Sequence, residues 1–137
     1  MTDISRLNVG DALPDHVSPE ITRYVLALFC GGSGDHNPMH VDSDFAKSFG
    51  MPDVFAHGML SMAYLAQLLT KWVPQHHLRE YSGRFLAITP LHAKVVSTGK
   101  VSEIFELGGE RRARIEINAH TTAGLHTLAG EAIVALT

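Results

Sequence analysis

Cysteine and long apolar runs are the two features that this chain most clearly lacks. Cys30 is the only cysteine, so an intrachain disulfide cannot form and a cysteine-based zinc site is disfavoured. No stretch approaches the roughly 18 consecutive apolar residues of a membrane-spanning helix. The acidic start of the chain also lacks the apolar segment of a signal peptide. We therefore expect a cytoplasmic protein that does not enter a membrane.

The chain also has no excess of basic residues: 11 Lys and Arg stand against 14 Asp and Glu, for a formal net charge of −3. Because a nucleic-acid-binding face concentrates Lys and Arg, we expect no nucleic-acid partner. The length of 137 residues, with 45% hydrophobic and 18% charged residues, suits one packed domain. Since no repeat or linker divides the chain, residues 1–137 are predicted to form a single domain.

Three helices are predicted in the first half of the chain. Residues 18–20 (Ser-Pro-Glu) have the order of a helix start, with a capping hydroxyl, a proline at the first helical position and an acid in the first turn. The Gly-Gly pair at 31–32 would end this helix. A short helix is expected over residues 42–49 and a long one over about 56–72. The long helix is apolar on nearly all sides, which is typical of a helix in the middle of a domain.

The second half of the chain has the pattern of β-strands. Residues 112–120 alternate polar and apolar side chains, as expected for a half-buried antiparallel strand, and Gly-containing turns are predicted at 108–109 and 123–124. The predicted strands cover residues 84–88, 94–105, 112–120 and 125–136, after a short N-terminal strand. The fold class is therefore α+β, with a curved antiparallel meander of about four strands wrapped around one long apolar helix.

The loop after the first predicted helix carries Asp35 and His40, with Asn37 and Pro38 between them. An Asn-Pro turn can fold the chain back so that both side chains reach one cleft. A carboxylate and an imidazole that share a water molecule are common equipment for general acid–base catalysis, and Asn37 could orient them. From the residue types alone, a plain turn in which Asp35 caps a helix and His40 packs remains open.

A metal site in this loop is not expected. His36 and His40 have the four-residue spacing of a metal-binding pair on a helix. Pro38 lies between them and prevents the helical geometry that the pair would need.

The run SGDHNPMH at residues 33–40, with Phe29 before it and Ala46 after it, resembles the signature of MaoC-like dehydratases, the (R)-specific enoyl-CoA hydratases with a hot-dog fold. A second motif of this family, His-Gly-Met at the start of the buried helix, matches residues 57–59. The likeness extends over nearly the whole chain. One departure is the sequence Pro-Leu-His-Ala at 90–93, where the family often has a Gly-Asp turn.

The resemblance implies (R)-specific hydration of trans-2-enoyl-CoA to (R)-3-hydroxyacyl-CoA, or the reverse dehydration. By this likeness Asp35 and His40 would hold and activate the water. The backbone N–H of Gly58, at a helix N-terminus, would stabilise the negative charge that develops on the thioester oxygen. No cofactor is expected, because coenzyme A is part of the substrate.

Three further residues, Asn37, His57 and Ser61, are predicted to bind the substrate. For His57 the alternative is a structural role at the helix start. For Ser61 it is a surface hydroxyl or one that bonds back to the helix backbone.

Two other functions remain open. The same chemistry could act on an acyl-carrier-protein thioester, as a 3-hydroxyacyl dehydratase subunit of fatty-acid or polyketide synthesis. A non-catalytic hot-dog subunit that stabilises a catalytic partner is the other alternative, although such a subunit would not need both Asp35 and His40. The resemblance also implies a homodimer, with a related heterodimer as the alternative, since one protomer leaves a sheet edge uncovered.

Overall fold

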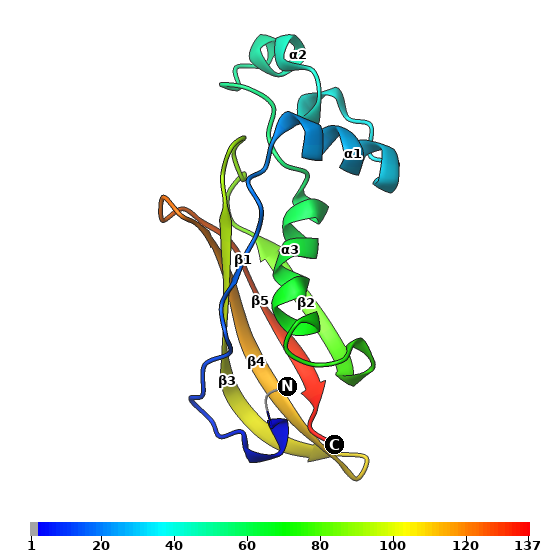
Figure 1. Cartoon of the computed structure of the whole chain (residues 1–137), viewed down its shortest axis with the longest axis vertical. Helices are drawn as coiled ribbons and strands as arrows, with labels where there is room; N and C mark the ends of the chain where they lie inside the picture. Colours follow the sequence, from blue (N-terminus) through cyan, green and yellow to red (C-terminus); the bar gives the residue numbers. More distant parts are fainter. Residues whose placement is uncertain (1–2) are drawn as a thin grey trace.

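A five-stranded antiparallel sheet curves around one long helix, as Figure 1 shows for the computed structural model, which describes residues 3–137. The strand order is β1-β3-β4-β5-β2, and this arrangement confirms the predicted α+β hot-dog fold. The strands are β1 (His16–Val17), β2 (Leu78–Phe85), β3 (Val95–Leu107), β4 (Glu110–Thr121) and β5 (His126–Ala135). The helices are α1 (Arg23–Ser33), α2 (Ser43–Ser48) and α3 (Gly58–Thr70), with 3-10 turns η1 (Ile4–Arg6), η2 (Pro38–His40) and η3 (Gln75–His77).

The core lies between α3 and the concave face of the sheet. Leu65 on α3 and Ile115 and Ile117 on β4 are completely buried there, because the apolar side chains of an alternating strand all point to one face. Met59 and Ala63, one turn apart on α3, are exposed. The sheet therefore covers α3 from one side, and the prediction of a helix buried all round is correct for that side alone.

Strands β3, β4 and β5 form three strands of the predicted meander, while β2, the strand before them, pairs with β5 and not with β3. Gly108 and Gly109 both have positive φ angles, 60° and 75°, as a two-residue hairpin turn requires. The prediction of a strand over 84–88 is wrong in its bounds: β2 ends at Phe85, and the N–H groups of residues 86 and 87 both donate to the carbonyl of Thr127. The chain leaves the sheet there, and β2 forms the outer strand beside β5.

Helix α1 begins later than predicted. The Ser18 hydroxyl, predicted as a cap, accepts the N–H of Val95 at 2.9 Å, and the Ser18 N–H donates to the Val95 carbonyl at 2.8 Å. The segment at 18–20 thus continues alongside β3 as extended chain. The cap is Thr22, whose hydroxyl accepts the N–H of Val25. Pairing with a strand far along the chain overrides the local helix-start pattern.

The turn that departs from the family pattern contains His92 with φ of 68°. This left-handed conformation is one that glycine adopts readily and other residues adopt at a cost. Two hydrogen bonds close the turn. The His92 N–H donates to the Ile21 carbonyl at 2.7 Å, and the Ala93 N–H donates to the Pro90 carbonyl at 3.3 Å. Residues 90–93 therefore form a closed turn, with His92 at a position that favours glycine.

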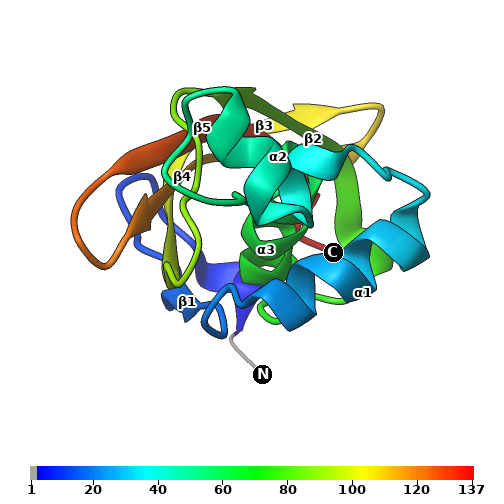
Figure 2. The same ribbon diagram turned by 90° about the horizontal axis from the view of Figure 1, so that it is seen from above.

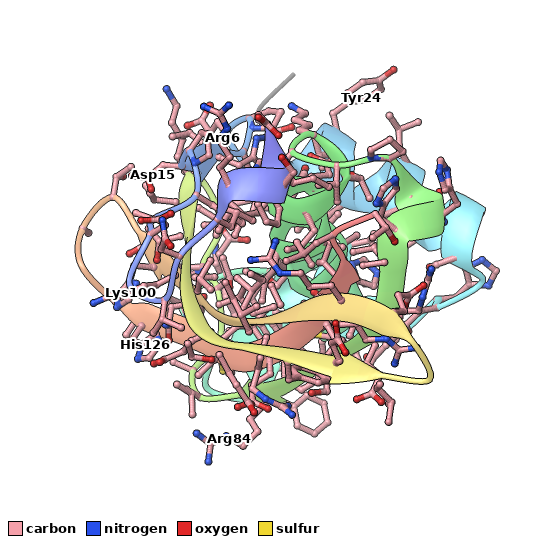
Figure 3. All side chains as sticks on the ribbon, turned by 90° about the horizontal axis from the view of Figure 1, so that it is seen from below. Arg6, Asp15, Tyr24, Arg84, Lys100 and His126 are labelled. Atoms are coloured by element: carbon pink, nitrogen blue, oxygen red, sulfur yellow. The ribbon has the colours of Figure 1, made fainter. Side chains whose placement is uncertain are left out.

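Helices α1 and α2 lie over the end of α3 at which Gly58 is found, as the view from above shows (Figure 2). On β2, Arg84 projects outward from the sheet (Figure 3), so its neighbour Phe85 faces α3, since successive strand side chains alternate between faces. Within residues 3–137, no helix is long and apolar enough to cross a membrane.

Candidate active site

The catalytic loop candidate starts where α1 ends. Helix α1 continues through the Gly-Gly pair to Ser33, and Gly34 takes the left-handed conformation with φ of 76°, so the predicted end at 31–32 is early by one to two residues. The Ser33 hydroxyl donates to the Phe29 carbonyl at 2.6 Å and accepts the Asp35 N–H at 3.1 Å. These bonds hold the chain so that the Asp35 carboxylate is exposed at the surface.

Asn37 shapes the loop. Its side-chain oxygen accepts the N–H of Met39 at 3.1 Å and so caps η2, while the N–H of Asn37 donates to the Asp35 carboxylate at 3.3 Å. This is the turn expected from the Asn-Pro pair, and it places Asp35 and His40 on the same side. Contact of Asn37 with a substrate stays a prediction.

His40 is buried to 7% exposure and its orientation is fixed by a backbone carbonyl. Its Nδ1 lies 2.7 Å from the carbonyl oxygen of Phe55. Because a carbonyl can only accept, Nδ1 carries the hydrogen, and in the neutral ring Nε2 is left with a lone pair. The Phe55 ring also packs edge-on against His40, with ring centroids 5.1 Å apart. The arrangement gives His40 one nitrogen that can accept a proton.

His57 lies directly behind His40. The two rings stack with centroids 3.9 Å apart and an angle of 23°. The Nε2 of His57 lies 3.3 Å from the Asp35 carbonyl oxygen, to which it donates, and 3.2 Å from Cys30 Sγ. Burial, and then the neighbouring His40, lower the pKa of His57, which favours a neutral ring.

The side chain of His57 is completely buried. This burial suits the alternative weighed for it, a structural role in which His57 joins the start of α3 to the loop of residues 34–40, while contact of His57 with a substrate stays a prediction. Burial and the nearby Asp35 carboxylate also raise the pKa of the Cys30 thiol, so Cys30 is a neutral packing partner of His57.

A groove of about 320 Å³ opens beside His40 at the start of α3. Gly58 is the first residue of α3, where a backbone N–H has no acceptor inside the helix. Ser61, one turn later, faces the same groove, and its hydroxyl lies 3.1 Å from the Thr89 hydroxyl. The other lining residues are Phe55, Ala56, Phe85, Leu86, Ala87, Ile88 and Thr127.

The arrangement thus combines an acid–base pair with an apolar groove. Ligating atoms of Asp35, His40 and His57 all lie within 4.8 Å of one another. Two hydrogen bonds of about 2.8 Å each can span such a distance through one water molecule. Asp35 and His40 are therefore close enough to share a single water molecule, and His40 lines the groove together with Gly58.

The comparison with known families decides what kind of domain this is. The model described as "MaoC like domain" matches residues 7–127. The chain belongs to the MaoC-like dehydratase family. It is therefore a domain of the hydratase and dehydratase type, as the loop motif and the helix-start motif indicated.

Named relatives of this MaoC-like domain agree on the type of chemistry. The 3-hydroxyacyl-thioester dehydratase Z of Mycobacterium tuberculosis is 27% identical over 127 residues, which cover 84% of this chain and 78% of the relative. The peroxisomal enoyl-CoA hydratase 2 of Arabidopsis thaliana is 36% identical over 76 residues, 53% of this chain. The chain spans 25%, 5% and 14% of the lengths of the first three curated relatives.

Solved structures show the same fold. The R-hydratase PhaJ1 from Pseudomonas aeruginosa is 29% identical with a TM-score of 0.83, over 97% of this chain and 84% of that one. An (R)-hydratase from A. caviae involved in PHA biosynthesis is 25% identical with a TM-score of 0.84, over 96% and 98%.

In this MaoC-like domain, the residues that come nearest to forming a metal site differ from the pair His36 and His40 considered from the sequence. His36 is exposed and lies outside the group, while Asp35, His40 and His57 converge. The Nε2 of His57 is committed as a donor to a backbone carbonyl, and a metal ligand must instead offer a lone pair.

Two contacts of the site were not predictable from motifs. Phe55 acts through its backbone carbonyl, which any residue could supply, so its side chain gives no signal in the sequence. Thr89 comes from the segment after β2, at a position where the sequence has no family motif. Its hydroxyl contacts that of Ser61 because the fold brings the segment after β2 against α3, and the sequence alone does not show this contact.

Proposed function

We propose that this domain catalyses the (R)-specific hydration of trans-2-enoyl-CoA to (R)-3-hydroxyacyl-CoA, and the reverse dehydration. The observation that carries the proposal is the convergence of Asp35 and His40, within the reach of one water molecule, beside an apolar groove that His40 and Gly58 line. The named hydratases and dehydratases among its relatives support the same chemistry.

In the proposed reaction, the Asp35 carboxylate and the His40 imidazole hold the attacking water. His40 Nε2 has the free lone pair because Nδ1 donates to Phe55, so it can accept a proton as the water oxygen adds to Cβ. The same pair returns a proton to Cα on the same face of the double bond. Positioned acid–base groups of this kind contribute about 10²–10⁴-fold to a rate.

The negative charge that develops on the thioester oxygen needs a donor. The N–H of Gly58 is at the N-terminus of α3, where the helix dipole favours a negative charge. The apolar residues of the groove would surround the acyl group. Coenzyme A enters as part of the substrate, and no further cofactor is needed for this addition.

The same atoms could process an acyl-carrier-protein thioester. This second candidate is favoured by the similarity to the 3-hydroxyacyl-thioester dehydratase and to fatty acid synthase beta subunits of fungi. The reacting group is the same in both cases, and the carrier differs.

We also propose that the domain acts as a homodimer. Strand β2 is an outer strand of the sheet. Beside its end, Phe85, Leu86 and Ile88 are 57%, 48% and 49% exposed, and Met59 on α3 is 61% exposed. An unpaired strand edge next to an apolar patch is a surface that a second copy would cover, at the rim of the groove. Sedimentation equilibrium would measure the mass, and a strictly monomeric active species would refute the proposal.

The catalytic proposal is tested with Asp35→Asn and His40→Gln, assayed by the loss of enoyl-thioester absorbance with crotonyl-CoA and a crotonyl carrier protein. Each variant should lose about 10²-fold or more in kcat with unchanged thermal unfolding. Asp44→Asn and His36→Gln, exposed nearby, serve as controls and should keep wild-type rates. Wild-type turnover in both site variants would refute the assignment, and chiral analysis of the product tests (R)-specificity.

A further inference from the structure

We propose that the hydroxyl pair of Ser61 and Thr89 donates a second hydrogen bond to the thioester oxygen, beside the N–H of Gly58. This inference rests on the proposed hydratase function. It adds Thr89 as a residue that orients the donor, and it gives Ser61 a defined partner atom on the substrate.

The two hydroxyls are buried but face the groove. Ser61 and Thr89 are each 3% exposed, their oxygens are 3.1 Å apart, and both residues line the groove together with His40 and Gly58. Much of the rest of that lining is apolar, with Phe55, Phe85, Leu86 and Ile88 among the side chains. A polar pair in such a place needs hydrogen-bond partners, because an unsatisfied buried hydroxyl is costly.

The two hydroxyls carry one more O–H proton than their mutual hydrogen bond uses. Two hydroxyls carry two protons, and their mutual hydrogen bond uses one of them, whichever oxygen donates. Within residues 3–137, this mutual bond is the one side-chain hydrogen bond found for either hydroxyl. One O–H is therefore left for an acceptor in the groove, and the thioester oxygen is an acceptor that gains negative charge during the reaction.

The helix geometry directs this donor to the same place as the Gly58 N–H. Ser61 follows Gly58 by three residues on α3, so the two residues share one face of the helix. Helical side chains also lean toward the N-terminus, which brings the Ser61 hydroxyl over the first turn. A thioester oxygen that accepts from Gly58 would then lie within reach of the hydroxyl.

Thr89 is held by the same short backbone pairing that positions His40. The N–H of Ala56 donates to the Thr89 carbonyl at 3.0 Å, and the neighbouring residues Phe55 and Pro90 form a β-bridge. The carbonyl of Phe55 in turn binds His40 Nδ1. The short pairing of 55–56 with 89–90 therefore fixes both the imidazole of His40 and the hydroxyl that faces Ser61.

The test compares Ser61→Ala, Thr89→Val, Thr89→Ser and the double variant Ser61→Ala/Thr89→Val. Thr98→Val, a half-buried threonine on β3 away from the groove, is the matched control. For each, kcat and KM with crotonyl-CoA, the inhibition constant of butyryl-CoA and the pH–rate profile are measured. Butyryl-CoA has the same thioester but cannot react, so it reports ground-state binding.

We expect Ser61→Ala to lower kcat by about 10² while the butyryl-CoA inhibition constant changes less than about threefold, since a donor to developing charge acts mainly in the transition state. Thr89→Val should lower kcat by about tenfold, and Thr89→Ser should restore it. The double variant should be no worse than Ser61→Ala, because Thr89 acts through Ser61. The pH profile should keep its shape, since neither hydroxyl titrates.

Unchanged kcat in Ser61→Ala, or equal losses of kcat and of butyryl-CoA binding, would overturn this inference. So would a loss in Thr98→Val as large as that in Thr89→Val. The wild-type enzyme separates this outcome from a failure of the proposed function. If it hydrates crotonyl-CoA with dependence on Asp35 and His40 while Ser61→Ala stays fully active, the hydroxyl proposal alone fails.

Discussion

Replacing Gly58 by alanine should separate the stability of this domain from its activity. A Cβ at Gly58 would lie 3.0 Å from Cε1 and Cζ of the Phe85 ring, a distance at which the ring must give by a few tenths of an ångström. In the single protomer Phe85 is 57% exposed, so its ring has room to move within that protomer. Alanine is favoured over glycine in a helix by up to about 1 kcal/mol, and this gain offsets the cost of moving the ring.

The two contributions predict a free energy of unfolding within about 1 kcal/mol of wild type, or a change in Tm of no more than about 4 °C. Activity should respond differently. The new methyl group and the displaced Phe85 ring both lie at the groove beside the N–H of Gly58. Loss of this donor geometry should cost about 10² in kcat.

Thermal unfolding and crotonyl-CoA hydration would be measured on Gly58→Ala, Phe85→Leu and the double variant. Phe85→Leu removes the ring atoms that meet the new Cβ, so the double variant should regain part of the activity that Gly58→Ala loses. The reasoning fails if Gly58→Ala is destabilised by several kcal/mol, which would mean that the ring cannot yield. It also fails if this variant keeps wild-type kcat.

Two further predictions concern stability. His92→Gly should raise the free energy of unfolding in urea by about 0.5–1 kcal/mol. The φ of 68° costs an L-residue about 1–2 kcal/mol, and the greater freedom of glycine in the unfolded state offsets part of the gain from removing that cost. A destabilised His92→Gly variant would contradict the prediction, and His92→Ala should show no gain. Hydrogen bonds from Ser43 and the Val54 N–H lower the pKa of Asp53 from 3.8 to about 2, so its stabilisation is present above pH 3.8 and lost as the pH falls through about 2. Asp53→Asn should therefore flatten the stability curve between about pH 4 and 2, and an unchanged slope in denaturation at stepped pH would refute this.

The parts of the site that local sequence determines were predictable, and those set by distant pairing were not. Asp35 and His40 converge because the Asn37 cap and Pro38 form a turn within six residues. The start of α1 was misplaced because Ser18 binds Val95, 77 positions away, and nothing near Ser18 in the sequence reveals that partner. The role of Thr89 could not be predicted for the same reason.

The strand over 84–88 was predicted from its apolar residues, which are equally suited to a strand and to the lining of a groove. Residues 86–88 belong to the groove wall. A pattern of side chains indicates where apolar surface is needed, but not whether a sheet, a ligand or a second subunit will cover it.

The two ends of the described chain meet far from the chemistry. The Arg111 guanidinium donates to the carbonyl of Ser5 at 2.8 Å, and the Arg111 carbonyl accepts the N–H of Leu136 at 2.9 Å. This junction lies at the end of the sheet opposite α1 and α2 (Figure 1). A polypeptide fused to either end would therefore leave the domain at the end of the sheet away from the groove. The fold is therefore suited to serve as a module inside longer proteins, and relatives in which the matched segment occupies 5% to 25% of the length use it in that way.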